Sequence, residues 1–464
     1  MGLPNVNITI RDGAMGLASE KVTGLHAVIG SCDSNDGTLG VNQVAMVSDA
    51  DTAGELFDGQ LSGGVLAALA AGARQVVACR AANTGVGSIS AVTHVGTGPT
   101  IPTPEGTPTA DHDVSIEITT GGALNVAKFV ATIDGVVQPE ATLQASQAVA
   151  HVQVTCPAGT YVEGDTYAFS TTEAAPTLED LTDALEALTA SRLSDQISWV
   201  HVAQPCGASA WAALVALVET LFPATYRYVH LVCEATAPRE GETTDHWVQR
   251  LLDESADVSH PRLSVVAGRV MATHPVTGDD FAFNLAPIYC GRLAQVPEQR
   301  SPGAVIDGAL PFVTGLSPDD LTDAHILQLD TTGRFVTARR YAGLPGIFIT
   351  NGRMMAAPTS DYRWVEWRRV MDLACTEVRL AGLRSEHIEY DEAALPAIVA
   401  DLQAPLNRMV AAGKCTAAEI AVPAGQDVLG TSTLRVKIRI QPKATLRWLE
   451  LELALSNPYL NAAE

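Results

Sequence analysis

The sequence predicts a mixed α/β (α+β) protein that carries an inserted all-β domain and ends in a smaller domain of helices and strands. Three observations lead to this fold class. Apolar strands and helical segments alternate before residue 83 and again after residue 174, which is typical of a sheet covered by helices. The composition changes between these two positions, and two strongly alternating strand patterns stand near the C-terminus.

The composition limits the class of protein. With 464 residues, 47% of them hydrophobic and 17% charged, the chain is long enough for several domains with buried cores. The formal net charge of −23 disfavours nucleic acid as a partner. Eight cysteines are scattered without a CxxC pair, which favours reduced thiols in a cytoplasm over disulfides or a zinc site. We expect neither a secretory signal near the N-terminus nor direct insertion into a membrane.

An extended arm is predicted over residues 1–22, where Val6, Ile8 and Ile10 alternate with polar residues. The first part of the α/β core follows over residues 23–82. Its predicted elements are strands at residues 25–29, 41–47 and 75–79 and a helix at residues 61–71.

The inserted β-rich domain is predicted over residues 83–174. Clusters of Gly, Thr and Pro separate alternating runs here, and the region contains nine acidic residues and the single lysine Lys128. The predicted strands cover residues 114–119, 127–133, 148–154 and 166–170. We expect this domain on the solvent side of the molecule.

The second part of the core is predicted over residues 175–345. Helices and strands alternate in its first half, with helices at residues 177–189, 208–221 and 244–253 and strands at residues 197–203, 228–233 and 263–270. Residues 275–345 are predicted to be loop-rich, because prolines recur throughout that stretch.

A C-terminal domain with a C-terminal arm is predicted over residues 346–464, with helices around residues 364–380 and 393–412. Residues 434–440 and 449–455 both alternate with a period of two, and an antiparallel register matches them. In that register the leucines at 449–455 meet the apolar residues at 434–440. Lys437 then meets Glu452, and Arg439 meets Glu450, so the pairing satisfies both burial and charge. The same complementarity could act between two copies of the chain.

No motif in the sequence indicates catalysis, and we predict no catalytic, cofactor-binding or metal-binding residues. There is no GxSxG, HExxH or Walker loop, and the glycines at 85–87 and 96–98 are interpreted as turns. Acidic turns at residues 33–36 and 111–113 are weak metal candidates. Two alternatives stay open. The chain could be an α/β enzyme of unknown reaction, or a tail or capsid surface protein that binds host glycans through the β insertion.

The order of elements resembles the sheath protein of contractile phage tails and related contractile injection systems. Four stretches carry the resemblance, namely residues 51–59 with 72–80, residues 285–292 with 302–304, residues 365–383, and residues 434–455. The opening residues 1–6 resemble most a phage-tail subgroup catalogued only as a family of unknown function.

This resemblance implies a sheath-type core and a structural role rather than enzymatic activity. It implies a helical homopolymer of hexameric rings around a tail tube protein, together with baseplate and tail terminator proteins. Such a sheath contracts to drive the tube through the host cell envelope, in a virion tail assembled in the bacterial cytoplasm. The resemblance further implies that the arms add strands to sheets of neighbouring subunits, which makes Val6, Ile8, Ile10, Lys437, Arg439, Glu450 and Glu452 candidate interface residues.

Overall fold

A computed structural model describes residues 24–32, 38–108, 112–133, 136–150, 152–172, 174–224, 226–239, 242–273, 280–391 and 393–455. The predicted arm with Val6, Ile8 and Ile10 lies outside these residues, as do the acidic turn at residues 33–36 and Asp111. The fold is mixed α/β, as the sequence predicts. None of the described helices is long and apolar enough to cross a membrane.

A six-stranded sheet forms the centre of the molecule, with the strand order β16-β15-β14-β1-β3-β2. Five strands are parallel, and β2 joins antiparallel at one edge. The strands are β1 (His26–Gly30), β2 (Val44–Val47), β3 (Val76–Arg80), β14 (Trp199–Pro205), β15 (His230–Glu234) and β16 (Leu263–Val266).

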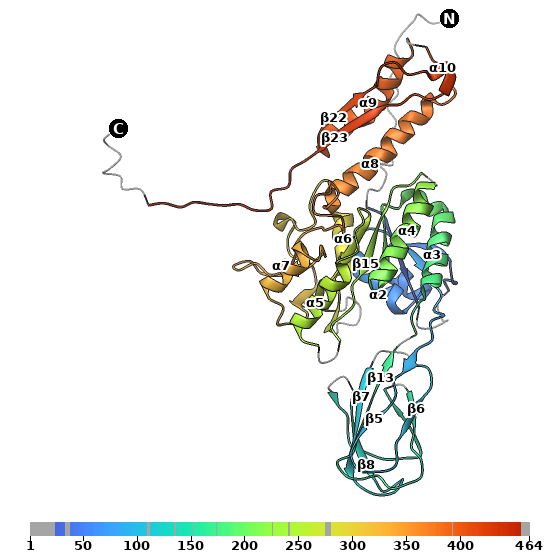
Figure 1. Cartoon of the computed structure of the whole chain (residues 1–464), viewed down its shortest axis with the longest axis vertical. Coiled ribbons are helices and arrows are strands. Elements are labelled where there is room, and N and C mark those ends of the chain that lie inside the picture. The colour runs from blue at the N-terminus through green and yellow to red at the C-terminus, as the bar shows by residue number, and fades with distance from the viewer. Residues whose placement is uncertain are drawn as a thin grey trace, which may run out of the picture.

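Helices cover both faces of this sheet, which explains why its strands are almost wholly apolar. Ala27 and Ile29 of β1 pack with helices α3, α4 and α5 on one face, and Val28 packs with α2 on the other. Helix α6 joins α2 on that second face (Figure 1). The helices are α1 (Ala50–Leu56), α2 (Gly59–Ala70), α3 (Leu178–Ala190), α4 (Ala208–Ala224), α5 (Thr244–Ser255) and α6 (Ala286–Gln295).

A β segment leaves the central sheet after β3 and returns at α3, and it has a hydrophobic core of its own. Its main sheet has the order β10-β8-β7-β13-β4, and β11, β12 and β6 form a second sheet. Figure 1 shows the segment at the opposite end of the molecule from α9. The strands are β4 (Ser88–Ile89), β5 (Thr93–Val95), β6 (Thr103–Glu105), β7 (His112–Thr120), β8 (Lys128–Ile133), β9 (Val136–Val137), β10 (Ala141–Thr142), β11 (Ser146–Val149), β12 (Val152–Thr155) and β13 (Thr166–Thr172).

The two ends of this β segment are joined at the start of α3. Thr177 and Asp180 form a capping box, in which each side chain accepts a hydrogen bond from the other residue's backbone. The Asp180 carboxylate also accepts hydrogen bonds from the Thr84 backbone and hydroxyl, at 3.0 and 2.8 Å. One buried carboxylate therefore links the outgoing strand to the returning helix.

The prediction of a loop-rich stretch over residues 275–345 holds only in part, because it misses helix α6. The structure places regular elements there, and α6 is buried along most of its length. Pro287 lies in the first turn of α6, where a missing N–H costs nothing, so this proline marks a helix start and not a loop. The remaining elements are η1 (Arg192–Gln196), β17 (Arg269–Thr273), β18 (Asp280–Asn284), η2 (Val305–Asp307), β19 (Val313–Leu316), α7 (Asp323–Thr331), β20 (Ala338–Arg339) and β21 (Phe348–Ile349).

The C-terminal region consists of two long helices that pack against a two-stranded sheet. The elements are α8 (Val365–Gly382), η3 (Leu383–Ser385), α9 (Leu395–Ala411), β22 (Cys415–Ala421), α10 (Val428–Thr431) and β23 (Lys437–Pro442). Residues 443–455, which we call the C-terminal extension, follow β23 without forming a helix or strand. Figure 1 shows the extension running away from β22 and β23 and projecting from the molecule.

Candidate interaction site at the C-terminal extension

The predicted pairing of residues 434–440 with residues 449–455 of the same chain is wrong. β23 pairs instead with β22, in a register that places Ile438 opposite Ile420 and Arg439 opposite Glu419. Lys437 lies opposite Ala421. Glu419 thus lies opposite Arg439, the position that the sequence pattern assigned to Glu450. The interface roles of Lys437, Arg439, Glu450 and Glu452 stay a prediction.

The β22–β23 sheet has two strands among the described residues, and its apolar face is only partly covered. Ile420, Ile438 and Ile440 pack against the core that α8 and α9 share, yet each keeps some exposure to solvent. A hairpin-sized sheet of two strands is marginal in water, and an edge strand can be completed by a further strand.

The extension exposes the leucines that the sequence pattern predicts to be buried. Leu449, Leu451, Leu453 and Leu455 have exposed fractions of 69%, 73%, 94% and 105%. Single exposed leucines are ordinary, but four at alternate positions on one projecting segment form a continuous apolar edge. Such a segment is ready to pair as a strand with an apolar surface elsewhere.

The base of the extension is held to the body by a compact set of contacts, which we call the Arg447 clasp. Its members are Asn351, Trp364, Glu366, Thr445 and Arg447. The Arg447 guanidinium lies 3.5 Å from the centre of the Trp364 ring and forms an ion pair with Glu366. Its Nε donates to Asn351 Oδ1 at 3.2 Å, and the Thr445 hydroxyl donates to Glu366 Oε1 at 3.3 Å.

The clasp is buried although it joins a projecting segment. The Glu366 side chain is fully buried and that of Arg447 is 9% exposed. Burial lowers the pKa of Arg447, and the Glu366 carboxylate opposes that effect. Within the described residues, Arg447 is the ion-pair partner of Glu366, so its loss would remove the direct ion pair of a buried carboxylate.

The exposure of the extension changes in step with these contacts. Thr445 and Arg447 are partly buried against the body. Leu446, which lies between them, and Trp448, which follows them, are largely exposed. Just before them, Trp367 Nε1 donates to the Lys443 carbonyl at 3.3 Å. Residues 443–447 are therefore fixed on the body, and the freely projecting part begins at Trp448.

Histidines in the central sheet are packed rather than arranged for catalysis. His26 and His230 stack on Trp199 with ring centres 5.1 and 5.8 Å away. Burial lowers the pKa of His26 to about 3 and that of His230 well below its usual value, so both rings are neutral. His201 contacts Glu234 at 2.9 Å inside the same core.

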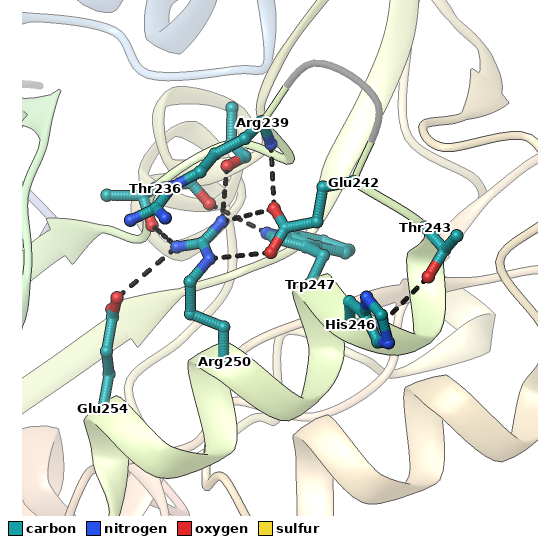
Figure 2. A network of polar contacts seen from close by, with 9 residues as sticks. Thr236, Arg239, Glu242, Thr243, His246, Trp247, Arg250 and Glu254 are labelled. Atoms are coloured by element: carbon teal, nitrogen blue, oxygen red, sulfur yellow. Dashed lines mark hydrogen bonds and ion pairs between the residues drawn. The ribbon is translucent and has the colours of Figure 1, made fainter.

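The loop that follows β15 is also occupied by structural contacts, although ligands of α/β proteins often bind at such strand ends. Figure 2 shows Arg250 of α5 at the centre of a polar network. Its guanidinium forms a two-pronged ion pair with Glu242 at 2.8 and 2.9 Å and donates to the Thr236 hydroxyl at 2.7 Å. The Arg250 hydrogen bonds lower the pKa of Glu242 to about 2.

The described residues contain no group of three or more side chains suited to holding a metal ion. Of the sequence-derived metal candidates, His112 and Asp113 lie at the start of β7, and the rest lie outside the described residues.

Sequence reasoning missed the clasp entirely. Its members come from residues 351–366 and 445–447, and contacts over such separations leave no periodic pattern. One signal was available, because Arg447 is a lone cation in an otherwise apolar and acidic stretch that begins at Ala444.

Comparison with solved structures shows a shared fold. A chain in the structure of the anti-feeding prophage (AFP) baseplate in the contracted state is 12% identical, and the match covers 99% of this chain and 100% of that one with a TM-score of 0.56. A chain in the 6-fold symmetrised AFP baseplate is 13% identical, with coverages of 62% and 76% and a TM-score of 0.44. At such identity, the full-length match establishes a similar fold and nothing further.

Comparison with protein families identifies the chain more directly. No curated protein matches it. The model described as DUF2586, N-terminal domain, matches residues 3–353, and the model described as DUF2586, C-terminal domain, matches residues 361–460. Because these two models together span nearly the whole sequence, the chain belongs to the DUF2586 family.

Proposed function

We propose that the protein is a structural subunit of a contractile tail sheath, in a phage tail or a phage-like injection particle. Copies of the chain polymerise as stacked hexameric rings around an inner tube, and the polymer contracts to drive the tube through a cell envelope. The full-length fold similarity to a chain of a contracted injection-system baseplate supports this class of assembly. No nucleotide is required, because the energy is the difference between two packings of one subunit.

The exposed extension is the observation that carries the proposal. In this proposal an extension with four solvent-facing leucines and a two-stranded sheet with partly exposed isoleucines are the two halves of one interface. The occupant of the β23 edge is then the extension of another copy, which adds a third strand by backbone hydrogen bonds. The chain's own N-terminal arm, with Val6, Ile8 and Ile10, serves as a further strand for a neighbouring subunit.

The register drawn from the sequence remains usable between copies. In that arrangement Arg439 lies between Glu419 on one side and Glu450 of the arriving strand on the other, while Lys437 faces Glu452 of the arriving strand. Exposed pairs of this kind contribute only ~0.2–1 kcal/mol each. Because these ion pairs repeat in every subunit of the polymer, they can nevertheless define the register of the paired strands.

Electron microscopy of two chains tests the proposal. Purified full-length protein is expected to form long striated tubes in negative stain. A chain that ends at Trp448 keeps the clasp and every described strand, and it is expected to remain a folded monomer. Discrete particles from the full-length chain, or normal tubes from the shortened one, would contradict the proposal.

The β segment is expected to lie outside the interface. The two ends of residues 83–174 meet beside Asp180, so replacing the segment with a short linker should leave tube formation intact. Loss of tubes from a subunit that still folds would place this segment within the assembly contacts.

A further inference from the structure

The chain contains a strand that fits its own sheet edge. Residues 449–455 complement residues 434–440 in alternation and in charge, and both belong to one polypeptide. Eight residues separate Ile440 from Leu449, which is more than the two to five residues that a hairpin loop usually needs. Nothing in the length of the chain therefore prevents the extension from turning back onto β23.

Such a turn would be favoured over pairing with another copy. A segment joined to its acceptor by a short linker acts at an effective concentration in the ~mM range, above that of free subunits in solution. A subunit that paired its own strand would fill the β23 edge and hide the four leucines at once. Such a subunit could then neither donate its extension to another copy nor accept the extension of another copy.

The structure shows how the residues between β23 and Leu449 are held. After Pro442 the chain is held along the start of α8 through the Lys443 carbonyl, Thr445 and Arg447. Leu449 lies two residues beyond Arg447, so its Cα stays within about 7 Å of the Arg447 Cα, and the clasp fixes where the leucine-rich segment begins. Figure 1 shows the extension leaving the molecule on a course away from β22 and β23.

We propose that the Arg447 clasp prevents each subunit from pairing its C-terminal strand with its own β23 edge, and so keeps strand and edge available to other copies. This inference rests on the strand exchange in the proposed function and assigns Arg447 a positioning role. The clasp residues Trp364 and Glu366 lie on the body, so the device is complete within one subunit.

Cross-linking of isotopically mixed subunits tests the proposal. Equal amounts of ¹⁴N- and ¹⁵N-labelled protein are mixed and treated with a zero-length carbodiimide, and the Lys437–Glu452 cross-link is analysed by mass spectrometry. The native protein is expected to give mixed-isotope links, because the two residues come from different copies. Arg447→Gln is expected to lose tubes and to give single-isotope links alone.

Arg384→Gln is the matched control, because it removes a cation from the same C-terminal region without changing the clasp or residues 434–440. Arg384 belongs to η3, and its side chain is exposed. This variant should behave as the native protein does. Mixed-isotope links and normal tubes from Arg447→Gln would overturn the role of the clasp while leaving strand exchange intact.

If Arg447→Gln disturbs folding, Glu366→Gln serves as a second variant that breaks the clasp. A peptide-binding measurement is then made on both variants. A fluorescent peptide with the sequence of residues 449–455 is added to each variant, either full-length or ending at Trp448. We expect at least tenfold weaker binding to the full-length variant than to its shortened form, since its own strand fills the edge. Equal binding to the two forms overturns the proposal. Absence of binding to the shortened native chain contradicts strand exchange itself, and with it the proposed function.

Discussion

Replacing Leu453 with alanine tests whether this side chain stabilises the proposed polymer without stabilising the isolated subunit. Leu453 is 94% exposed and makes no contribution to any described hydrophobic core. The free energy of unfolding of the isolated subunit should therefore change by less than about 0.5 kcal/mol, as for other exposed positions. In the proposed polymer the same side chain is buried beside Val436 of another copy, just before β23.

The expected effect on assembly follows from the carbon atoms removed. Leucine to alanine deletes three carbons, and burial of each stabilises by ~0.8 kcal/mol, so each subunit contact loses about 2.4 kcal/mol. At 1.4 kcal/mol per tenfold change, the pairwise association constant falls about 50-fold. The critical concentration for tube formation, measured by pelleting, should rise by a comparable factor.

Leu429→Ala is a suitable control, because Leu429 is 97% exposed and belongs to α10 instead of the extension. It should change neither subunit stability nor the critical concentration. The reasoning is refuted if Leu453→Ala lowers the melting temperature of the isolated subunit by several degrees, since the side chain would then be buried within its own chain. An unchanged critical concentration would refute it equally.

Three further predictions follow from the charges and the arms. Glu452→Lys should hinder assembly, and adding Lys437→Glu should restore it at least partly; a double variant as defective as the single one would exclude the register between copies. Removing residues 1–12 should give folded subunits that form no stable tubes, and normal tubes from that chain would contradict the role of the N-terminal arm. Arg250→Met should destabilise the subunit by about 1.5–3 kcal/mol in urea unfolding, because it removes charged hydrogen bonds to Glu242. Since the pKa of folded Glu242 is lowered to about 2, its contribution is present above an unfolded pKa of about 4.3 and is lost as the pH falls toward 2. The difference in free energy of unfolding between Arg250→Met and the native protein should therefore disappear at low pH. An equal difference at pH 2 and pH 7 would show that it does not arise from the Glu242 carboxylate.

The elements of the central sheet could be predicted because their signals are local. The apolar run at residues 75–79 nearly coincides with β3, and Thr177 followed by Asp180 marks the start of α3 through its capping contacts. α6 escaped prediction for the opposite reason. It is buried on almost all sides, so it has no polar face to give a helical period, and Pro287 suggests a loop until its place in the first turn is known.

The candidate site could be predicted only in part. The alternation of the four leucines predicts a strand, but the structure shows none at residues 449–455, and the strand role stays a prediction. β22 was overlooked as the partner of β23 because the sequence Cys-Thr-Ala-Ala-Glu-Ile-Ala alternates only weakly, with small residues at several positions. The clasp depends on side chains about 80 residues apart, which no local pattern reveals.

The wrong pairing in the sequence interpretation and the proposed polymer have the same physical origin. Alternation and charge determine which two edges fit, and they are identical whether the edges belong to one chain or to two. Only the path of the connecting residues distinguishes the two cases, and here that path is fixed by Arg447 on Trp364 and Glu366. In the proposed polymer, a segment that complements its own subunit but is held away from it pairs with the same edge of another copy. Self-complementarity in the sequence together with a restraint at the base of the extension therefore favours a polymer over a closed monomer.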